Sequence, residues 1–343
     1  PGAPSPGITV PTTSYRSSKP LPRNALPIDF YAERTAHNHG PLVWLLVLTQ
    51  LSVGAFCVEQ LLARLAPGAH TPLHAAVALT LGLLALNASI LHLGRPLYAF
   101  RAILGIRTSW MSREIAAFGG FAGLASAYAA MVAVTAGWLS GVALTLPASL
   151  ERAIAPLGLL VSASGLFAVF CSVMLYAVTG RRWWSVPRTT FRFFGTAAVL
   201  GTATSLFVTL ASAVFVDGGE LDSELASVVR HLGIALVALT SVKLGGEATV
   251  FLHLRDSQRG ELRRSAQLLA RRLHRSTFFR FFVSGLGGAV LPLLVVIPAT
   301  EGSAVGPFIA SSLGVLLCVA GEAIERTTFF TAVSAPRMPG AHV

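Results

Sequence analysis

The residues best suited to chemistry lie in one short stretch between two hydrophobic segments. Ile90-Leu-His-Leu-Gly-Arg-Pro96 supplies His92 and Arg95, and Ser112-Arg-Glu-Ile115 supplies Glu114. A neutral imidazole accepts a proton near physiological pH, and a carboxylate accepts or relays a second one. Arginine holds a carboxylate ionised or binds a quinone oxygen. Together these residue types at a membrane edge predict the handling of a redox-active, proton-releasing lipid such as a quinol.

The composition predicts a membrane protein. Of the 343 residues, 53% are hydrophobic and only 12% are charged, which is more apolar surface than a soluble domain can bury. The net charge of +11 gathers in particular loops, without lysine runs or the interleaving of aromatic and basic residues found in single-strand nucleic-acid binders. Cys57, Cys171 and Cys318 lie in apolar runs and form no C-x-x-C, so we expect no iron–sulfur cluster or zinc site in this chain.

The hydrophobic runs predict an all-α integral membrane fold with eight transmembrane helices. A helix needs roughly 20 apolar residues to cross the hydrocarbon core, and runs of this kind cover about 41–64, 73–93, 114–138, 153–179, 194–216, 227–252, 280–300 and 304–327. The second run ends in Leu91-His-Leu-Gly-Arg95 and the sixth in Leu252-His-Leu-Arg255, which indicates two four-helix halves. Residues 255–280 predict a basic amphipathic helix at the interface.

Three regions follow from this division. Residues 1–40 form an extended Pro/Ser-rich arm, which we interpret as a linker from an upstream iron–sulfur domain or as a partner contact. Residues 41–335 form the eight-helix membrane domain, and 336–343 form a short C-terminal tail.

The charge pattern predicts the orientation. Lysine and arginine gather in the arm and in residues 95–113, 181–192 and 255–280, whereas the fifth loop carries Asp217, Glu220, Asp222 and Glu224. By the positive-inside rule, both termini and the His92 loop face the cytoplasm of an inner (cytoplasmic) membrane.

Ionisable side chains within spans are costly and indicate function. Those at the cytoplasmic ends of four spans are predicted to lie at one level, with His92, Arg95 and Glu114 supported by Arg113, Glu247, Glu322 and Arg326. Simpler roles stay open for several of them: Arg95 as an interfacial anchor, Arg113 and Arg326 as snorkelling or partner-contact residues, and Glu247 as a neutralising partner of Lys243 at i, i+4. Ser112 is a candidate cap for the third span.

At these residues the sequence resembles the membrane-anchor subunit family of dimethyl sulfoxide reductase. The resemblance is carried by Leu91–Phe100, Ser112–Ile115 and Ala320-Gly-Glu-Ala-Ile-Glu-Arg326, and it covers about residues 40 to 335. It implies an anchor without metal that binds menaquinol through His92 and Glu114. Haem is not expected either, because no histidine lies in the middle of a span. Electrons would pass to a four-cluster iron–sulfur subunit and then to a molybdopterin catalytic subunit. Glu322 and Arg326 fall on the family's Gly-Glu…Arg pattern.

The leading hypothesis is therefore the membrane anchor and quinol-binding electron-transfer subunit of a molybdenum oxidoreductase complex. The alternatives are a secondary transporter, which the edge position of the ionisable groups disfavours, and a purely structural anchor without a quinone site. The resemblance places the His92 loop on the side of the catalytic partners, whereas the charges place it inside.

Overall fold

A computed structural model describes residues 35–37, 39–65, 72–90, 96–138, 147–216, 218–257, 260–298 and 301–334. The predicted site residues His92 and Arg95 lie outside these ranges, as do nearly all of the predicted arm and the whole C-terminal tail.

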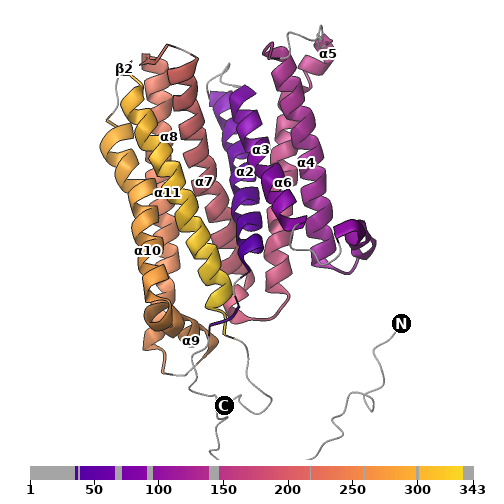
Figure 1. Ribbon diagram of the computed structural model, residues 1–343, viewed down its shortest axis with the longest axis vertical. Coiled ribbons are helices and arrows are strands. Elements are labelled where there is room, and N and C mark those ends of the chain that lie inside the picture. The colour runs from indigo at the N-terminus through magenta and orange to yellow at the C-terminus, as the bar shows by residue number, and fades with distance from the viewer. Residues whose placement is uncertain are drawn as a thin grey trace, which may run out of the picture. The chain divides into compact units, whose positions relative to one another are not determined.

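The described chain is almost entirely helical (Figure 1). The long helices are α2 (Gly40–Leu65), α3 (Pro72–Ile90), α4 (Trp110–Thr135), α6 (Ile154–Ala177), α7 (Val186–Phe215), α8 (Ser223–Ala248), α10 (His274–Gly285) and α11 (Val305–Thr331). Helix α8 continues as a 3-10 helix over Thr249–Arg255, and α10 continues through π-helical turns over Leu286–Val290 and Pro292–Val296. In this part of the chain seven helices are long and apolar enough to cross a bilayer, and α3 is a shorter apolar helix. The prediction of an all-helical membrane protein is confirmed.

Short elements connect the long helices. They are a 3-10 helix over Pro96–Gly105, α5 (Ala148–Glu151), a 3-10 turn over Arg182–Trp184, α9 (Glu261–Gln267) with a π turn over Leu268–Arg272, and the strands β1 (Glu220–Leu221) and β2 (Gly302–Ser303). The two strands pair antiparallel. The predicted interfacial helix over 255–280 is divided, because α9 ends before a break at Leu273 and α10 begins at His274.

Several helices begin earlier than hydropathy predicts. Helix α7 begins at Val186 instead of 194, and α10 at His274 instead of 280. Their first turns carry arginines, which end a hydrophobic run without ending the backbone hydrogen bonding. Helix α4 begins at Trp110, and the predicted cap was wrong: Ser109 is the N-cap, and its side chain accepts a hydrogen bond from the backbone N–H of Ser112.

The long helices pack in two groups of four. In the first, α2 contacts α3 and α6, and α4 contacts the same two helices. In the second, α7 contacts α8 and α11, while α10 and its continuation contact the same two helices. The groups meet where α2 crosses α7. A Cβ atom on Gly54 would lie 1.8 Å from the carbonyl oxygen of Ala197, and one on Gly201 would lie 2.3 Å from the backbone of Gly54. This close approach requires glycine on both helices.

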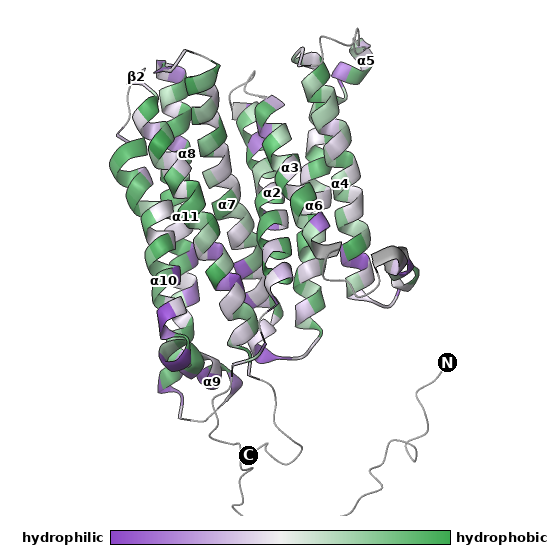
Figure 2. Cartoon of the chain, in the orientation of Figure 1, coloured by the Kyte–Doolittle hydropathy of each residue, from purple (hydrophilic) through white to green (hydrophobic). Residues whose placement is uncertain are grey.

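Basic side chains gather at one end of the helices. This basic end holds the starts of α2, α4, α7 and α10, and the ends of α3, α6, α8 and α11, next to α9 (Figure 1). Figure 2 shows hydrophilic residues concentrated there and green, apolar helix surfaces beyond. The opposite end carries Glu151, Glu220, Asp222 and Glu224.

Candidate functional site

Glu114 is a buried carboxyl group at the basic end of the first helix group. It lies in the second turn of α4, which the Ser109 cap starts, and it is 9% exposed. Its Oε1 accepts a hydrogen bond of 2.5 Å from the Ser172 hydroxyl on α6. Among the described residues Glu114 has no ion pair, so no cation here stabilises its charge. Within the described residues, the carboxyl is therefore held by the Ser172 hydroxyl and not by a charged partner.

Arg113 points away from Glu114 and holds the preceding loop. Its Nε donates to the carbonyl of Ile106 at 2.9 Å, and its Nη2 donates to that of Arg107 at 2.8 Å. Its guanidinium also lies 4.3 Å from the ring centre of Trp110. These contacts fix the backbone between the 3-10 helix and α4, so Arg113 acts on the position of α4.

Aromatic side chains connect the end of α6, near Glu114, with helices of the second group. Tyr176 follows Ser172 by one helical turn, and its ring makes edge contacts with Trp184, Phe193 and Phe329 at 5.2–5.8 Å between centroids. The indole N–H groups of Trp183 and Trp184 both donate to the carbonyl of Phe329 at 3.0 Å. This aromatic group ties the turn after α6 to the end of α11.

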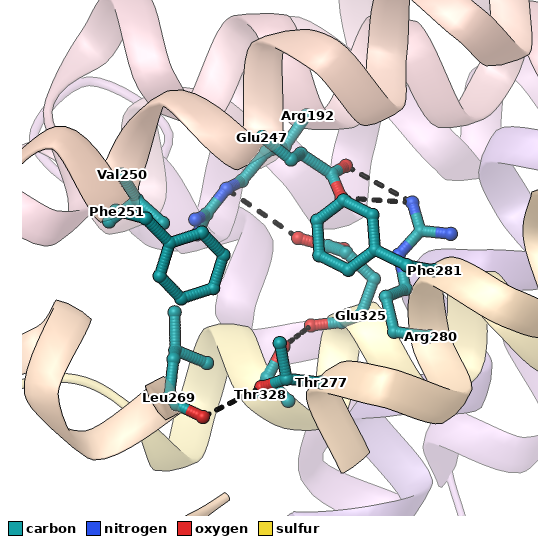
Figure 3. A pocket seen from close by; sticks show the side chains of 10 residues that line it. All are labelled: Arg192, Glu247, Val250, Phe251, Leu269, Thr277, Arg280, Phe281, Glu325 and Thr328. Atoms are coloured by element: carbon teal, nitrogen blue, oxygen red, sulfur yellow. Dashed lines mark hydrogen bonds and ion pairs between the residues drawn. The ribbon is translucent and has the colours of Figure 1, made fainter. Parts of the chain in front are cut away.

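A charged cluster fills the basic end of the second helix group. We define it as seven side chains that are all buried or half-buried: Arg192, Lys243, Glu247, Arg280, Glu322, Glu325 and Arg326. They come from α7, α8, α10 and α11. Four cations face three carboxylates, which leaves a formal charge of +1 inside the span. Figure 3 shows four of the seven around a small pocket.

Glu322 lies at the centre of these contacts. Its carboxylate accepts from Arg280 and from Lys243, each at 3.0 Å, and from the Thr196 hydroxyl at 2.7 Å. Glu247 pairs with Lys243 on the same helix and with Arg280 at 3.0 Å. The predicted Lys243–Glu247 pair is therefore present, within a larger network.

Arg326 links the charged cluster to the first helix group. Its Nη2 donates to Gln50 Oε1 on α2 at 2.9 Å and to the Thr196 hydroxyl at 3.1 Å, and it pairs with Glu325 at 3.5 Å. Arg326 is 0% exposed, so the suggestion that it snorkels was wrong. Its guanidinium lies over the ring of Phe193 at 4.1 Å, which replaces water on that face.

A small cavity adjoins the charged cluster. Its volume is about 30 Å³, enough for a water molecule. Arg192 and Arg280 line it, with Glu247 and Glu325 (Figure 3). Arg192 pairs with Glu325 at 3.6 Å, while its Nη1 has no hydrogen-bond partner in the part of the chain that the structure describes.

The predicted site residues thus fall into two places. Glu114 contacts α6, whereas Glu247, Glu322 and Arg326 meet within the second group. Ser172, Thr196 and Gln50 were missed, because a single hydroxyl or amide in an apolar span carries no signal until its neighbour is known. Within the described ranges no group of three His, Cys, Asp or Glu side chains is arranged to hold a metal ion.

Two further polar sites lie apart from these. At the basic end, His253 lies between Arg188 and Asp256, each at 2.8 Å. Toward the opposite end of α2, Glu59 is buried and accepts from the Tyr128 hydroxyl at 3.1 Å, and Gln60 donates to that hydroxyl.

These helices and buried charges define a multi-pass helical membrane subunit. The profile of the DMSO reductase anchor subunit (DmsC) family matches residues 34–332, and the chain belongs to this family. Over 211 residues it is 28% identical to a chain of the anaerobic dimethyl sulfoxide reductase of Haemophilus influenzae, covering 60% of this chain and 69% of that protein. Over 189 residues it is 33% identical to a subunit of the sulfite dehydrogenase of Allochromatium vinosum, covering 53% of this chain and 51% of that protein.

Proposed function

We propose that this chain anchors a molybdenum oxidoreductase complex in the membrane and exchanges electrons between menaquinol or menaquinone and an iron–sulfur partner. The relatives support this assignment: one is named as a chain of dimethyl sulfoxide reductase and the other as a subunit of sulfite dehydrogenase. The partners would be an iron–sulfur subunit or fused domain and a molybdopterin catalytic subunit. They would dock over the basic end, where arginines complement acidic surfaces.

The contrast between Glu114 and the other buried carboxylates at the basic end carries the proposal. Glu247, Glu322 and Glu325 each pair with at least one cation, which fixes their charge. Among the described residues, Glu114 is held by a hydroxyl alone. Because an unpaired buried carboxyl changes protonation without breaking an ion pair, Glu114 is the group suited to take a proton during quinol oxidation.

Different residues of this chain would accept the two protons and hold the quinone. Oxidation of a quinol releases two electrons and two protons, and the electrons leave through the partner's clusters. His92 takes one proton and Glu114 takes the other, while Arg95 holds a quinone oxygen or an ionised carboxylate. Ser172 orients the Glu114 carboxyl. Arg113 fixes the loop that leads into α4. The two helix groups, with a histidine at the end of α8, support an internal repeat whose first half carries this site.

The experiment compares quinol-driven and dye-driven turnover in the assembled complex. The variants are Glu114→Gln and His92→Ala, with Glu59→Gln as a matched buried glutamate near the opposite end of α2. Turnover is measured with a water-soluble naphthoquinol and, separately, with a reduced viologen that delivers electrons directly to the partner. Binding is followed by fluorescence quenching of a hydroxyquinoline N-oxide, a quinol analogue.

We expect Glu114→Gln and His92→Ala to lower naphthoquinol turnover at least tenfold while viologen turnover and assembly are retained. Glu59→Gln should resemble the unsubstituted complex in every measurement. Unchanged naphthoquinol turnover in both Glu114→Gln and His92→Ala would instead identify a structural anchor without a quinone site.

A further inference from the structure

A groove opens on the outer surface of the helices at the basic end. It lies between the starts of α2 and α10 and the last turns of α11, and its volume is about 270 Å³. Its lining includes Gly40, Val43, Trp44, Ser276, Ala323 and Thr327. Successive residues of an α-helix are rotated by about 100° around the helix axis. On α11 this rotation places the lining residues on the face opposite Glu322, Glu325 and Arg326. The groove is therefore separate from the charged cluster and from Glu114.

We propose that this groove binds one acyl chain of an anionic phospholipid whose phosphate group lies at the start of α10. Basic residues adjoin the groove in the sequence: Arg275 directly precedes the lining residue Ser276, Arg272 lies one turn before it, and both arginine side chains are exposed. Neither α2 nor α10 has an acidic residue in its first turn, so the positive ends of both helix dipoles add to this field. Basic residues at pockets between transmembrane helices favour the binding of anionic lipid headgroups.

The order of residues along the helices matches the layers of a bilayer. Arg275 is followed on α10 by exposed Phe278, Phe279 and Phe282, about 5–10 Å further along the helix axis. On α2, Trp44 is 45% exposed and forms one wall of the groove. Charge at the surface, aromatic rings at the interface and an apolar channel below correspond to a headgroup, its ester region and an acyl chain.

The small side chains of the groove explain its capacity. Ala323 and Thr327 are one helical turn apart on α11, and Gly40 and Ser276 face them from the other two helices. None of these side chains is large enough to fill the space between the helices, while Trp44 closes one side. A linear hydrocarbon chain fits such a channel, whereas an extended protein segment would carry backbone polar groups that hydrocarbon cannot satisfy.

The test measures retained and titrated lipid by native mass spectrometry of the full chain in mild detergent. The probes are phosphatidylglycerol and phosphatidylcholine with identical acyl chains. Arg275→Gln removes a charge at the mouth, with Arg255→Gln as a control cation on the same end of the molecule. Ala323→Phe fills the channel, with Leu316→Phe as a control ring on the exposed surface of the same helix. Melting temperatures establish that each variant is folded.

We expect one tightly held phosphatidylglycerol, with phosphatidylcholine bound at least tenfold more weakly. Arg275→Gln should weaken phosphatidylglycerol binding about fivefold, since one basic residue near a membrane surface contributes about 1 kcal/mol. Ala323→Phe should abolish the retained lipid, while both controls bind as the unsubstituted chain does. If Ala323→Phe does not fold, the comparison of Arg275→Gln with Arg255→Gln decides alone.

Equal binding of the two lipids, or equal loss in Leu316→Phe and Ala323→Phe, would show only the general lipid shell and overturn the proposal. A photocrosslinker introduced at position 323 provides a further measurement. Crosslinks to phospholipid support the site. Crosslinks to the N-terminal arm or to a partner subunit would assign the groove to protein and overturn it.

Discussion

Replacing Glu322 by glutamine tests whether charge balance holds the second helix group together. Glu322→Gln keeps the shape of the side chain and removes its charge, so the charged cluster changes from a formal +1 to +2. The lost ion pairs are those with Lys243 and Arg280, both at 3.0 Å. Glu247 remains to balance these two cations.

The expected cost follows from the burial of these groups. Two unit charges about 4 Å apart interact by about 4 kcal/mol at an effective dielectric constant of about 20. Removal of one partner from a buried ion pair costs about 3–5 kcal/mol. Glu322 is 1% exposed and has two cationic partners, so we expect the upper part of this range, which corresponds to a melting temperature about 10 °C lower.

The assay is thermal unfolding of the purified chain in mild detergent, followed by tryptophan fluorescence. Lys243→Met combined with Glu322→Gln restores the formal charge to +1, and we expect this double variant to regain at least half of the loss. Glu151→Gln, an exposed acidic residue at the opposite end, is the control and should leave the melting temperature unchanged. Charge balance does not govern stability here if Glu322→Gln has the same melting temperature as Glu151→Gln. The same conclusion follows if the double variant has a lower melting temperature than Glu322→Gln.

Three further predictions follow. Gly54→Ala should push α2 away from α7 and lower the free energy of unfolding by about 3 kcal/mol through overpacking. Gly123→Ala, whose added methyl group meets open space, is the control and should be neutral or stabilising in the same thermal unfolding measurement. Ser172→Ala removes the hydrogen bond to Glu114, worth about 1.5–3 kcal/mol to a charged group, and should lower naphthoquinol turnover about tenfold with viologen turnover unchanged; unaltered naphthoquinol turnover would mean that orientation of the carboxyl is unimportant. Arg113→Gln should release the loop before α4, seen as faster tryptic cleavage at Arg107 with little change in melting temperature; unchanged cleavage would show that the two carbonyl contacts do not hold this loop.

The sequence predicted the helices well because each span must satisfy its own backbone in lipid. Hydropathy therefore located eight apolar segments, and the alternation of charged loops placed the basic residues at one end. Local spacing also predicted the Lys243–Glu247 pair, since residues four apart lie on one helix face. What failed were the helix starts, where arginines of the first turns lower the hydropathy without interrupting the helix.

The arrangement of the site depended on which helices are neighbours and how each is rotated. Glu114 and Glu322 occupy the same end of the molecule in the sequence-based picture, yet they contact different helix groups. Arg326 was open to two interpretations because a helix-end arginine is able to reach water, and only the positions of Gln50 and Thr196 show that it is buried. Pairwise contacts between spans leave no trace in the hydropathy of either span.

The order in which the charged cluster is synthesised has a consequence for biogenesis. Lys243 and Glu247 pair within α8 as soon as that helix forms, and Arg280 on α10 joins them. Arg192 on α7 meets its carboxylate, Glu325, only on α11. Before α11 is in place, Arg192, Lys243 and Arg280 therefore face a single carboxylate of the charged cluster, Glu247. A chain truncated before residue 305 would carry a formal charge of +2 in this cluster, where the complete cluster carries +1, and a buried excess charge is costly within a membrane.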